Sequence, residues 1–373
     1  MKPFENPIYI TRPMLPDLAD VNKEMEEIWK SQWLTNGGAK HQLLEEGLKK
    51  ELKVPYLSLF NNGTIALMVA IQSLRLSGEV ITTPFTFPAT THVLAWNNIT
   101  PVFCDIDEES LTLDPTKIAR MITSKTTGIL GVHVYGRPCH VEPIQEIADQ
   151  NGLRVIYDAA HAFNTEIDGK AIGTFGDVSM FSFHSTKLFH TVEGGALTCN
   201  SEHLKQRIDF LKNFGIKNED EVIMPGINGK LNEVQAAVGL LNLKNLATER
   251  AKRKQILETY LANLDGIPGV APFLMPEEVR HSYQYFMVRI GVDYGMNRND
   301  LYTELRKYNV FSRKYFYPLC SEYSSYRQLP SATPQNLPIA HKIVQEVLCL
   351  PFYGNLPLRD VEAICQLIRE LRG

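Results

Sequence analysis

Lys187 stands in the sequence where a lysine amine could act as a nucleophile. It follows an apolar run typical of a buried strand, residues 177–183, and the pair Gly194-Gly195 leads into a second strand-like run at 196–199. A lysine at the mouth of a buried strand is partly desolvated, which lowers the pKa of its amine. A neutral amine can attack a carbonyl and form a Schiff base. Because most lysines at strand ends are ordinary surface residues, this chemistry is predicted only if Lys187 has partners.

A carboxylate and an imidazole lie upstream, at the end of another strand-like run. Residues 153–158 are mostly apolar and end in Asp158, and Ala159-Ala160-His161 follows. A strand-end carboxylate can accept the proton of a ring nitrogen and hold a pyridine as its cation, which is the electron sink of pyridoxal phosphate chemistry. His161 can hydrogen-bond a phenolic oxygen. Each residue also has a structural alternative, since Asp158 could cap a helix and His161 could be a surface or capping histidine.

Four further residues have the types that a phosphorylated aromatic cofactor requires. Gly63 and Thr64 belong to a polar turn that opens an apolar helix, where free backbone N–H groups and the helix dipole favour a phosphate. Phe87 could stack on a ring, and Ser182 could give its hydroxyl to the phosphate. The structural alternatives are a plain helix cap, core packing and a strand-end serine. In this order, with the acid and the lysine near strand ends, the set predicts a lysine–pyridoxal phosphate site.

The hydrophobic pattern predicts an α/β protein. Strand-like and helix-like runs alternate, and the strands are continuously rather than alternately apolar, which favours a mainly parallel sheet covered on both faces. Strands are expected at 57–60, 80–82, 101–106, 127–134, 153–158, 177–183 and 196–199. Helices are expected at 17–30, 41–52, 65–76, 91–96, 115–122, 141–150 and 201–214, with a loop at 213–229.

A long helical pattern from residue 231 to about 264 predicts a bridge between two domains. We place the boundary near residue 245, which gives a large α/β domain with an N-terminal helical segment at 1–245 and a small α+β domain at 246–373. The small domain is expected to hold a strand at 285–290 and helices at 300–307, 337–348 and 358–372. Ligands of parallel sheets bind at the carboxyl ends of strands, where Asp158 and Lys187 both stand.

Composition excludes several classes of protein. The 373 residues are 44% hydrophobic and carry a formal charge of −4, so the chain can bury a large core and shows no sign of binding nucleic acid or a membrane surface. No apolar run is long enough to span a bilayer, and the polar, proline-broken start is not a signal peptide. The six scattered cysteines are typical of reduced thiols in a cytoplasmic protein. No metal site is expected.

The motifs of the chain resemble those of the DegT-type sugar aminotransferases, a branch of the type I (aspartate aminotransferase) fold. The resemblance extends over nearly the whole chain. It is carried by Asn62-Gly63-Thr64, Thr83-Pro84-Phe85-Thr86-Phe87, Pro101-Val102-Phe103-Cys104-Asp105-Ile106-Asp107, Val132-His133-Val134-Tyr135-Gly136, Asp158-Ala159-Ala160-His161, Gly173-x-x-Gly176-Asp177, Phe181-Ser182-Phe183-His184-x-x-Lys187, Glu193-Gly194-Gly195 and Asn228-x-Lys230-Leu231-x-Glu233-x-Gln235-Ala236-Ala237.

The resemblance implies pyridoxal 5′-phosphate as cofactor and a homodimer with shared active sites. Lys187 would bond to the cofactor and then shuttle the proton, and Asp158 would pair with the ring nitrogen. His161 would replace a more usual glutamine beside the ring hydroxyl, and Phe87 would stack on the ring. The phosphate would be held by Gly63, Thr64, Ser182 and, from the neighbouring subunit, Asn228. Candidates for substrate contacts, by position only, are Thr35, His184, Arg313 and Tyr317.

The resemblance also implies a reaction. Glutamate would give its amine to the cofactor and leave as 2-oxoglutarate, and the amine would then pass to the ketone of a nucleotide-linked deoxysugar. Lys187, where some relatives carry histidine, argues against the dehydratase branch. Segments 6–13 and 316–319 are similar to those of members that convert dTDP-4-keto-6-deoxyglucose to dTDP-4-amino-4,6-dideoxyglucose, for O-antigen or a related glycan.

Three other functions stay open at the level of the sequence. A C3-aminotransferase acting on a dTDP-3-keto-6-deoxyhexose needs only a differently tilted sugar in the same pocket. A binding or regulatory protein of this fold would keep the cofactor without turnover. A metabolic aminotransferase would need an arginine clamp for an α-carboxylate, and arginines are available at Arg289, Arg298, Arg306, Arg313 and Arg327.

Overall fold

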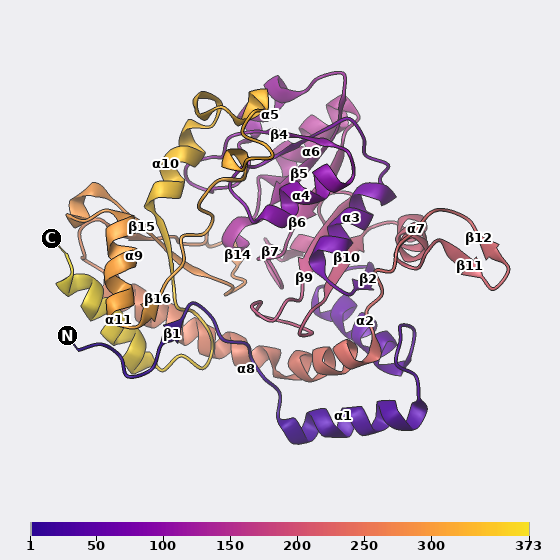
Figure 1. The fold of residues 1–373 in the computed structure, drawn as a ribbon, viewed down its shortest axis with the longest axis horizontal. Coiled ribbons are helices and arrows are strands. Elements are labelled where there is room, and N and C mark those ends of the chain that lie inside the picture. Colours follow the sequence, from indigo (N-terminus) through magenta and orange to yellow (C-terminus); the bar gives the residue numbers. More distant parts are fainter. Residues whose placement is uncertain (1, 373) are drawn as a thin grey trace.

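The computed structural model describes residues 2–372 and is built around a seven-stranded sheet (Figure 1). The strand order is β2-β10-β9-β6-β5-β3-β4, in which β10 is antiparallel to both neighbours and the other pairs are parallel. The strands are β2 Tyr56–Phe60, β3 Glu79–Thr82, β4 Thr100–Phe103, β5 Thr126–Val132, β6 Arg154–Asp158, β9 Val178–Ser182 and β10 Gly195–Cys199. The predicted α/β class with a mainly parallel sheet is confirmed.

Helices cover both faces of this sheet, because successive residues of a strand point to opposite sides. Leu130 and Ile156 face a core shared with α3, α4 and α7, whereas their neighbours Ile129 and Val155 face a core shared with α5 and α6. These helices are α3 Gly63–Ser73, α4 Pro88–Trp96, α5 Pro115–Ile118, α6 Val141–Asn151 and α7 Glu202–Lys212. Burial on both faces explains the continuous apolarity of the strands.

One long helix, α8 Glu233–Leu264, runs beneath the sheet and on to the C-terminal elements (Figure 1). It begins with a capping box, in which the side chains of Asn232 and Gln235 each accept the backbone N–H of the other residue. Its first half packs against α2 Ala39–Glu51 and its second half against α11 Leu358–Glu370, while α1 Leu18–Ser31 lies along it. The boundary placed near residue 245 falls inside this unbroken helix, and the division into domains stays a prediction.

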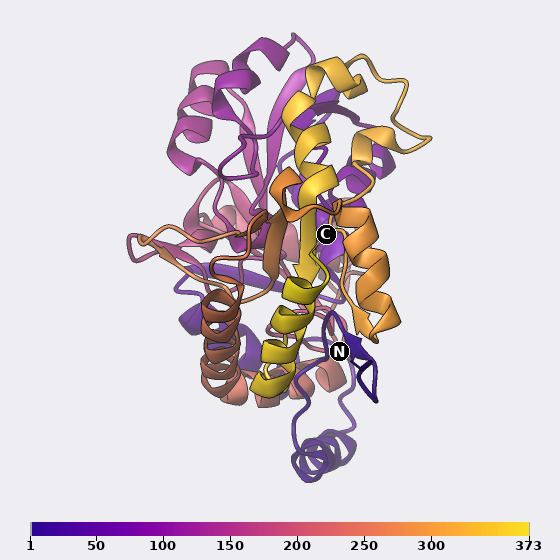
Figure 2. The same cartoon turned by 90° about the vertical axis from the view of Figure 1, so that its left-hand side faces the viewer.

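The C-terminal elements enclose a second, smaller core (Figure 2). Its antiparallel sheet has the order β13-β15-β17, with β13 Val270–Pro272, β15 Phe286–Ile290 and β17 Val347–Leu350. The ring of Tyr260 in α8 stacks on Phe286 with centroids 4.4 Å apart. Near the N-terminus, β1 Ile8–Tyr9 pairs with β16 Val310–Phe311 and contributes Ile8 to the same core, next to α9 Arg298–Lys307.

The remaining elements are short. A hairpin of β11 Ile216–Asn218 and β12 Glu221–Val222 extends away from the body of the molecule (Figure 1). A small sheet has the order β14-β7-β8, with β14 Val279–Arg280, β7 Glu166–Ile167 and β8 Lys170–Ala171. Helix α10 spans Pro338–Glu346, and 3-10 turns lie at 119–121, 134–136, 172–174, 292–294, 320–322, 330–332 and 334–336. Among residues 2–372, no helix is both long and apolar enough to cross a membrane.

Three sequence-based expectations differ from the structure. The helix expected at 337–348 ends at Glu346, because Val347–Leu350 pairs with β15 as a fully buried strand whose four apolar residues fit either period. The loop expected at 213–229 contains the β11–β12 hairpin. The helix expected at 115–122 is regular only over Pro115–Ile118 and continues as a 3-10 turn. Other boundaries move by a few residues; α3 begins at Gly63 rather than Ile65.

Candidate active site

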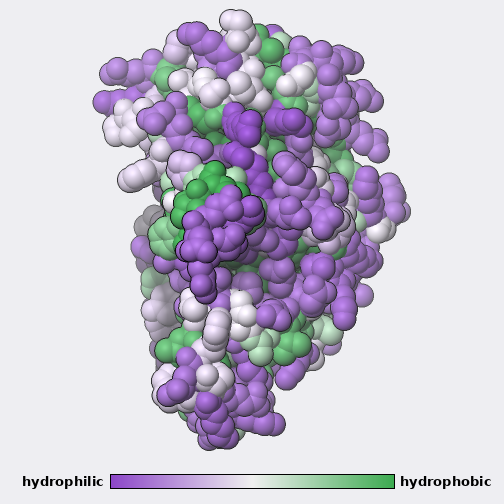
Figure 3. All heavy atoms as spheres, turned by 90° about the vertical axis from the view of Figure 1, so that its right-hand side faces the viewer, coloured by the Kyte–Doolittle hydropathy of each residue, from purple (hydrophilic) through white to green (hydrophobic). Residues whose placement is uncertain are grey.

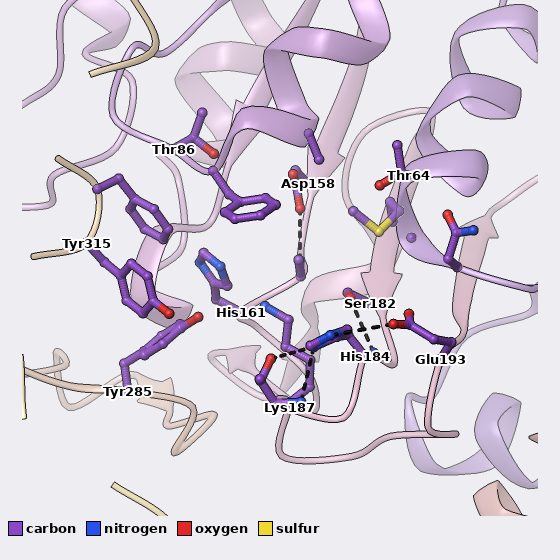
Figure 4. A pocket seen from close by; sticks show the side chains of 18 residues that line it. Thr64, Thr86, Asp158, His161, Ser182, His184, Lys187, Glu193, Tyr285 and Tyr315 are labelled. Carbon is purple, nitrogen blue, oxygen red and sulfur yellow. Dashed lines mark hydrogen bonds and ion pairs between the residues drawn. The ribbon is translucent and has the colours of Figure 1, made fainter. Parts of the chain in front are cut away.

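A cavity of about 260 Å³ opens at the carboxyl ends of β6 and β9, beside the first turn of α3. The C-terminal part closes it with Tyr285, Tyr315 and Phe316 (Figure 4). Eight residues predicted from the sequence line it, and they come from four separate stretches of the chain: Gly63, Thr64, Phe87, Asp158, His161, Ser182, His184 and Lys187. This is where ligands of parallel α/β sheets bind.

Asp158 ends β6 and is buried on the floor of this cavity. Its Oδ2 accepts a hydrogen bond from the Thr90 hydroxyl at 2.7 Å, and its Oδ1 accepts the Ala160 N–H at 3.0 Å. Burial raises the pKa of this carboxyl, while the two hydrogen bonds and the charge of Lys187 oppose the rise. The residues after Asp158 form turns rather than a helix, so the alternative role as a helix cap does not apply.

Lys187 lies in the loop that joins β9 to β10, and its N–H donates to the His184 carbonyl at 2.9 Å in a tight turn. Figure 4 shows the amine pointing into the cavity, toward the space between Asp158 and His161. Burial lowers the pKa of the Lys187 amine to about 8, and the nearby charge of Asp158 works against this shift. About a tenth of the amine is therefore neutral at pH 7, far more than for an ordinary lysine, and the neutral form is the one that a nucleophile requires.

His161 is held between aromatic rings. Its ring is stacked on Phe316 at 5.4 Å and meets the Tyr285 ring edge-on at 5.0 Å. Its Nδ1 is buried and has no hydrogen-bond partner among the described residues. Burial, reinforced by the charge of Lys187, lowers the pKa of His161 well below its usual value, so the ring is neutral. A buried nitrogen without a partner is costly, which points to a ligand that supplies one.

The first turn of α3 forms a cradle for an anion. Asn62 caps this helix by accepting the Ile65 N–H at 2.8 Å, and Gly63 and Thr64 follow at the open end. A Cβ at Gly63 would lie 3.2 Å from the Met180 sulfur and 3.3 Å from the Ser182 Cβ, so a larger residue would press against β9. Backbone N–H groups at a helix N-terminus favour a phosphate, and the hydroxyl of Ser182 lies beside them.

The mouth of the cavity is more exposed than its floor. Phe87 precedes α4, and 56% of its side chain is exposed. His184 hydrogen-bonds through Nδ1 to the Thr186 hydroxyl at 2.7 Å, and its Nε2 lies 3.5 Å from a carboxylate oxygen of Glu193. Both side chains are about half exposed at this mouth (Figure 4).

Four predicted contact residues are not among those that line the cavity. Asn228 and Thr35 are exposed, and the Thr35 hydroxyl donates to its neighbour Asn36. Arg313 is exposed, and the ring of Tyr317 lies against Arg298 and Lys314. Their proposed roles therefore depend on a partner chain or on the substrate. None of the five candidate clamp arginines lines the cavity either.

Sequence reasoning missed several residues of the site. The hydroxyls of Thr86 and Thr90 are 2.9 Å apart, and Thr90 in turn donates a hydrogen bond to Asp158. The two threonines are four residues apart, a helical spacing that could have indicated this contact in the sequence. Tyr285, Tyr315 and Phe316 come from the distant C-terminal part; Phe316 belongs to the segment 316–319 that supports the resemblance, but none of the three was predicted to line the site. Other missed lining residues are Asn62, Ala89, Ala160, Met180, Thr186 and Glu193. Among residues 2–372, no group of three or more His, Cys, Asp or Glu is placed to hold a metal ion.

The fold and the site together define a type I, aspartate-aminotransferase-like protein: a mainly parallel sheet with an acid at one strand end and a lysine in a neighbouring loop. Residues 17–369 match the model of the DegT/DnrJ/EryC1/StrS aminotransferase family. The chain belongs to this family, which confirms the predicted fold class and enzyme class.

Two bacterial relatives are similar over their full length. A dTDP-4-amino-4,6-dideoxy-D-glucose transaminase of Escherichia coli is 47% identical over 97% of this chain and 98% of that protein. A transaminase of the same name from Shigella dysenteriae is 42% identical over 99% of this chain and 100% of that protein. Among solved structures, DesI in the presence of its TDP-sugar product is 33% identical, with a TM-score of 0.94 over 99% of this chain and 94% of that chain.

Proposed function

We propose that this aminotransferase transfers the amine of L-glutamate to C4 of dTDP-4-keto-6-deoxyglucose, with pyridoxal 5′-phosphate as cofactor. The products are 2-oxoglutarate and dTDP-4-amino-4,6-dideoxyglucose. The names of the two bacterial relatives and the TDP-sugar product described with DesI support the choice of sugar. The observation that carries the reaction type is the convergence of Lys187, Asp158 and the glycine-opened turn of α3 on one cavity.

The residues present fit the proposed cofactor. His161 offers a buried nitrogen that lacks a partner, which the ring hydroxyl of the cofactor would provide. Gly63 lets the start of α3 lie close to β9, so that its backbone N–H groups and the Ser182 hydroxyl stand side by side where the phosphate would bind. Asp158 would face the ring nitrogen, and Phe87 would cover the ring from the mouth.

When bound, pyridoxal 5′-phosphate supplies a carbonyl carbon that takes up an amine and a ring that withdraws electrons. The neutral amine of Lys187 would hold the cofactor and, when free, would serve as a base and then as an acid at Nζ. Its lowered pKa of about 8 suits both roles near neutral pH. The same amine thus moves the proton in each half of the reaction.

Asp158 would keep a positive charge on the ring nitrogen of the cofactor. For this its carboxyl must be ionised, although burial favours the neutral form. The hydrogen bonds from Thr90 and from the Ala160 N–H stabilise the ionised form and fix its direction. A bound cation would lower the pKa of Asp158 further. Neutral His161 adds no charge that would compete with this pair.

A homodimer with shared active sites is part of the proposal. The β11–β12 hairpin projects from the body of the molecule. Because an isolated two-stranded hairpin is only marginally stable in water, we expect a partner to pack against it. Figure 3 shows apolar side chains, coloured green, gathered on the face at this side of the molecule. Exposed apolar residues on and around the hairpin include Phe214, Ile216, Val222, Ile223 and Ile227. A second copy would cover them and bring its exposed Asn228 toward the phosphate cradle.

We also propose where the enzyme acts in the cell and what its product is used for. All six cysteines are buried and unpaired, which supports the predicted location in the cytoplasm, where thiols stay reduced. The aminosugar product would serve the synthesis of O-antigen or a related glycan.

A product assay tests the proposed function. Purified protein, pyridoxal 5′-phosphate, L-glutamate and dTDP-4-keto-6-deoxyglucose are mixed, and the sugar product is identified by NMR. The expected result is an equatorial amine at C4. An axial amine would retain the chemistry and overturn the stereochemical assignment. Conversion of glutamate without a C4 amine would overturn the choice of sugar, and dTDP-3-keto-6-deoxyhexose is then tested for a C3 amine. No exchange with glutamate would favour a binding or regulatory protein.

A further inference from the structure

One buried amide side chain holds the chain on both sides of Lys187. The Oε1 of Gln284 accepts the N–H of Leu188 at 2.7 Å, and its Nε2 donates to the carbonyl of Thr186 at 3.1 Å. Only 5% of Gln284 is exposed, so water competes little for these bonds. One amide therefore contacts both peptide groups that flank the reactive lysine, and it also hydrogen-bonds to Tyr285 in the cavity wall.

These two contacts fix the backbone of Lys187. The Thr186 carbonyl belongs to the peptide plane before Lys187, and the Leu188 N–H belongs to the plane after it. Because peptide groups are planar, the orientations of these two planes set both φ and ψ of the residue between them. With φ and ψ fixed, the Cα–Cβ bond of Lys187 has one direction, which leads the amine into the cavity (Figure 4).

Gln284 is itself firmly anchored, and its anchor lies on α8. The carbonyl of Tyr283, in the peptide plane before Gln284, accepts a hydrogen bond from Nη1 of Arg253 at 3.1 Å. Arg253 is fully buried and forms an ion pair with Glu249 at 2.7 Å. After Gln284 the chain passes into the cavity wall at Tyr285 and then into β15. The backbone is thus fixed on both sides of Gln284.

We propose that Gln284 is a positioning residue for Lys187, which aims the lysine amine at the reacting carbon by gripping its two flanking peptide groups. Gln284 is not among the residues that line the cavity. By fixing the backbone, Gln284 restricts the positions that the flexible side chain of Lys187 can take. This restriction matters because small errors in the placement of a reacting group strongly reduce reaction rates. The inference rests on the proposed covalent role of Lys187.

The test compares Gln284→Met with a matched control, a buried residue of α8 that contacts the same loop. Methionine keeps the length of the side chain but forms neither hydrogen bond. The control is Asn242→Leu, because Asn242 is equally buried and donates at 2.9 Å to the carbonyl of His190, beyond the peptides that flank Lys187. Each substitution removes buried hydrogen bonds to the loop that carries Lys187, so both are expected to lower the melting temperature. Only Gln284→Met should affect the lysine.

Two readouts separate positioning from stability. For Gln284→Met we expect kcat to fall about 10- to 100-fold with the KM of glutamate changed less than about threefold, whereas Asn242→Leu stays within about threefold of wild type in both. In protein freed of cofactor, the pH dependence of labelling of Lys187 by acetic anhydride, read by mass spectrometry, should shift upward by about one pH unit in Gln284→Met, because a released amine reaches water. This second readout remains valid if the cofactor or the sugar is wrong.

The proposal is overturned if both variants lose similar thermal stability while Gln284→Met keeps the wild-type kcat and labelling profile. If Gln284→Met does not fold, Gln284→Glu replaces it. This variant keeps the acceptor for the Leu188 N–H and loses the donor to Thr186, and its kcat should still fall severalfold. An unchanged kcat in Gln284→Glu would equally contradict the role of the Thr186 contact.

Discussion

The floor of the cavity and its rim are built differently. The floor consists of Asp158, His161 and Lys187, which are fixed by buried contacts within one chain. The rim consists of Phe87, His184 and Glu193, each about half exposed. On the floor the pKa of each of the three groups is shifted by burial; at the rim no comparable burial exists.

This difference separates chemistry from recognition. Burial tunes the amine and orients the acid before any ligand arrives, and such preorganisation is how buried groups favour a reaction. The exposed rim leaves the ring face and the phosphate to be covered by the substrate and, as proposed, by a second copy of the chain. Substitutions on the floor should therefore reduce kcat, whereas substitutions at the rim should mainly weaken binding.

The largest effect is expected from Lys187→Ala. Without the amine there is neither a covalent hold on the cofactor nor a group to move the proton, so turnover should fall on the order of 10⁴-fold or more. The fold should be kept, because alanine leaves the backbone contacts of the loop intact. Initial rates and circular dichroism measure the two properties. Turnover near the wild-type level would disprove the assignment of the reactive lysine.

Asp158→Asn is expected to lower kcat about 10²- to 10³-fold. The amide retains the size of the side chain but cannot hold a positive charge on a ring nitrogen.

Thr90→Val should have a smaller effect on kcat than Asp158→Asn. It removes a hydrogen bond that lowers the pKa of Asp158, so the acid limb of the kcat profile should move to higher pH. If the acid limb does not move, the pKa that sets this limb belongs to a group other than Asp158.

Phe87→Ala tests the rim. With 56% of Phe87 exposed, its loss should leave the floor in place and remove only the stacking contact. We expect the dissociation constant of pyridoxal 5′-phosphate to rise about 3- to 10-fold, with kcat at saturating cofactor within about twofold of wild type. Equilibrium titration of cofactor-free protein measures the first value. A collapse of kcat at saturation would place Phe87 with the floor instead.

The smallest effect concerns the stability of cofactor-free protein. The Lys187 amine has a pKa of about 8 in the folded chain and 10.5 as its ordinary value, so the unfolded chain binds the proton more tightly. The protonated amine therefore costs stability below pH 8, and the cost disappears as the pH rises from 8 through 10.5. Lys187→Met should stabilise the protein at neutral pH by on the order of 1 kcal/mol, with less gain at high pH. Denaturant unfolding at two pH values measures this; a loss of stability at neutral pH would contradict it.

The floor could be predicted from the sequence because each of its residues stands at the end of a recognisable apolar run. Parallel strands bring such ends to one edge of the sheet, so separate local signals imply one site. Tyr285 and Phe316 could not be predicted, since they reach the cavity only through the packing of the C-terminal part against the sheet. The strand at Val347–Leu350 was mistaken for a helix because its pairing with β15, not its pattern, decides its structure.

The predicted contact residues Asn228, Thr35, Arg313 and Tyr317 show the limit of position-based prediction. All four are exposed and lie outside the cavity lining of a single chain. Their roles require a partner chain or a bound sugar, and neither can be deduced from the hydrophobic pattern of one sequence.

The central claim, a floor complete in one chain and a rim shared between two, is tested most directly by subunit complementation. Lys187→Ala and Asn228→Asp chains are co-expressed with different tags, and the mixed dimer is purified. The Asn228→Asp homodimer should be weak, because a carboxylate repels the phosphate, and the Lys187→Ala homodimer should be inactive. The mixed dimer should recover about half of the wild-type activity, since one of its two sites is intact. A mixed dimer no more active than the Asn228→Asp homodimer would contradict the account.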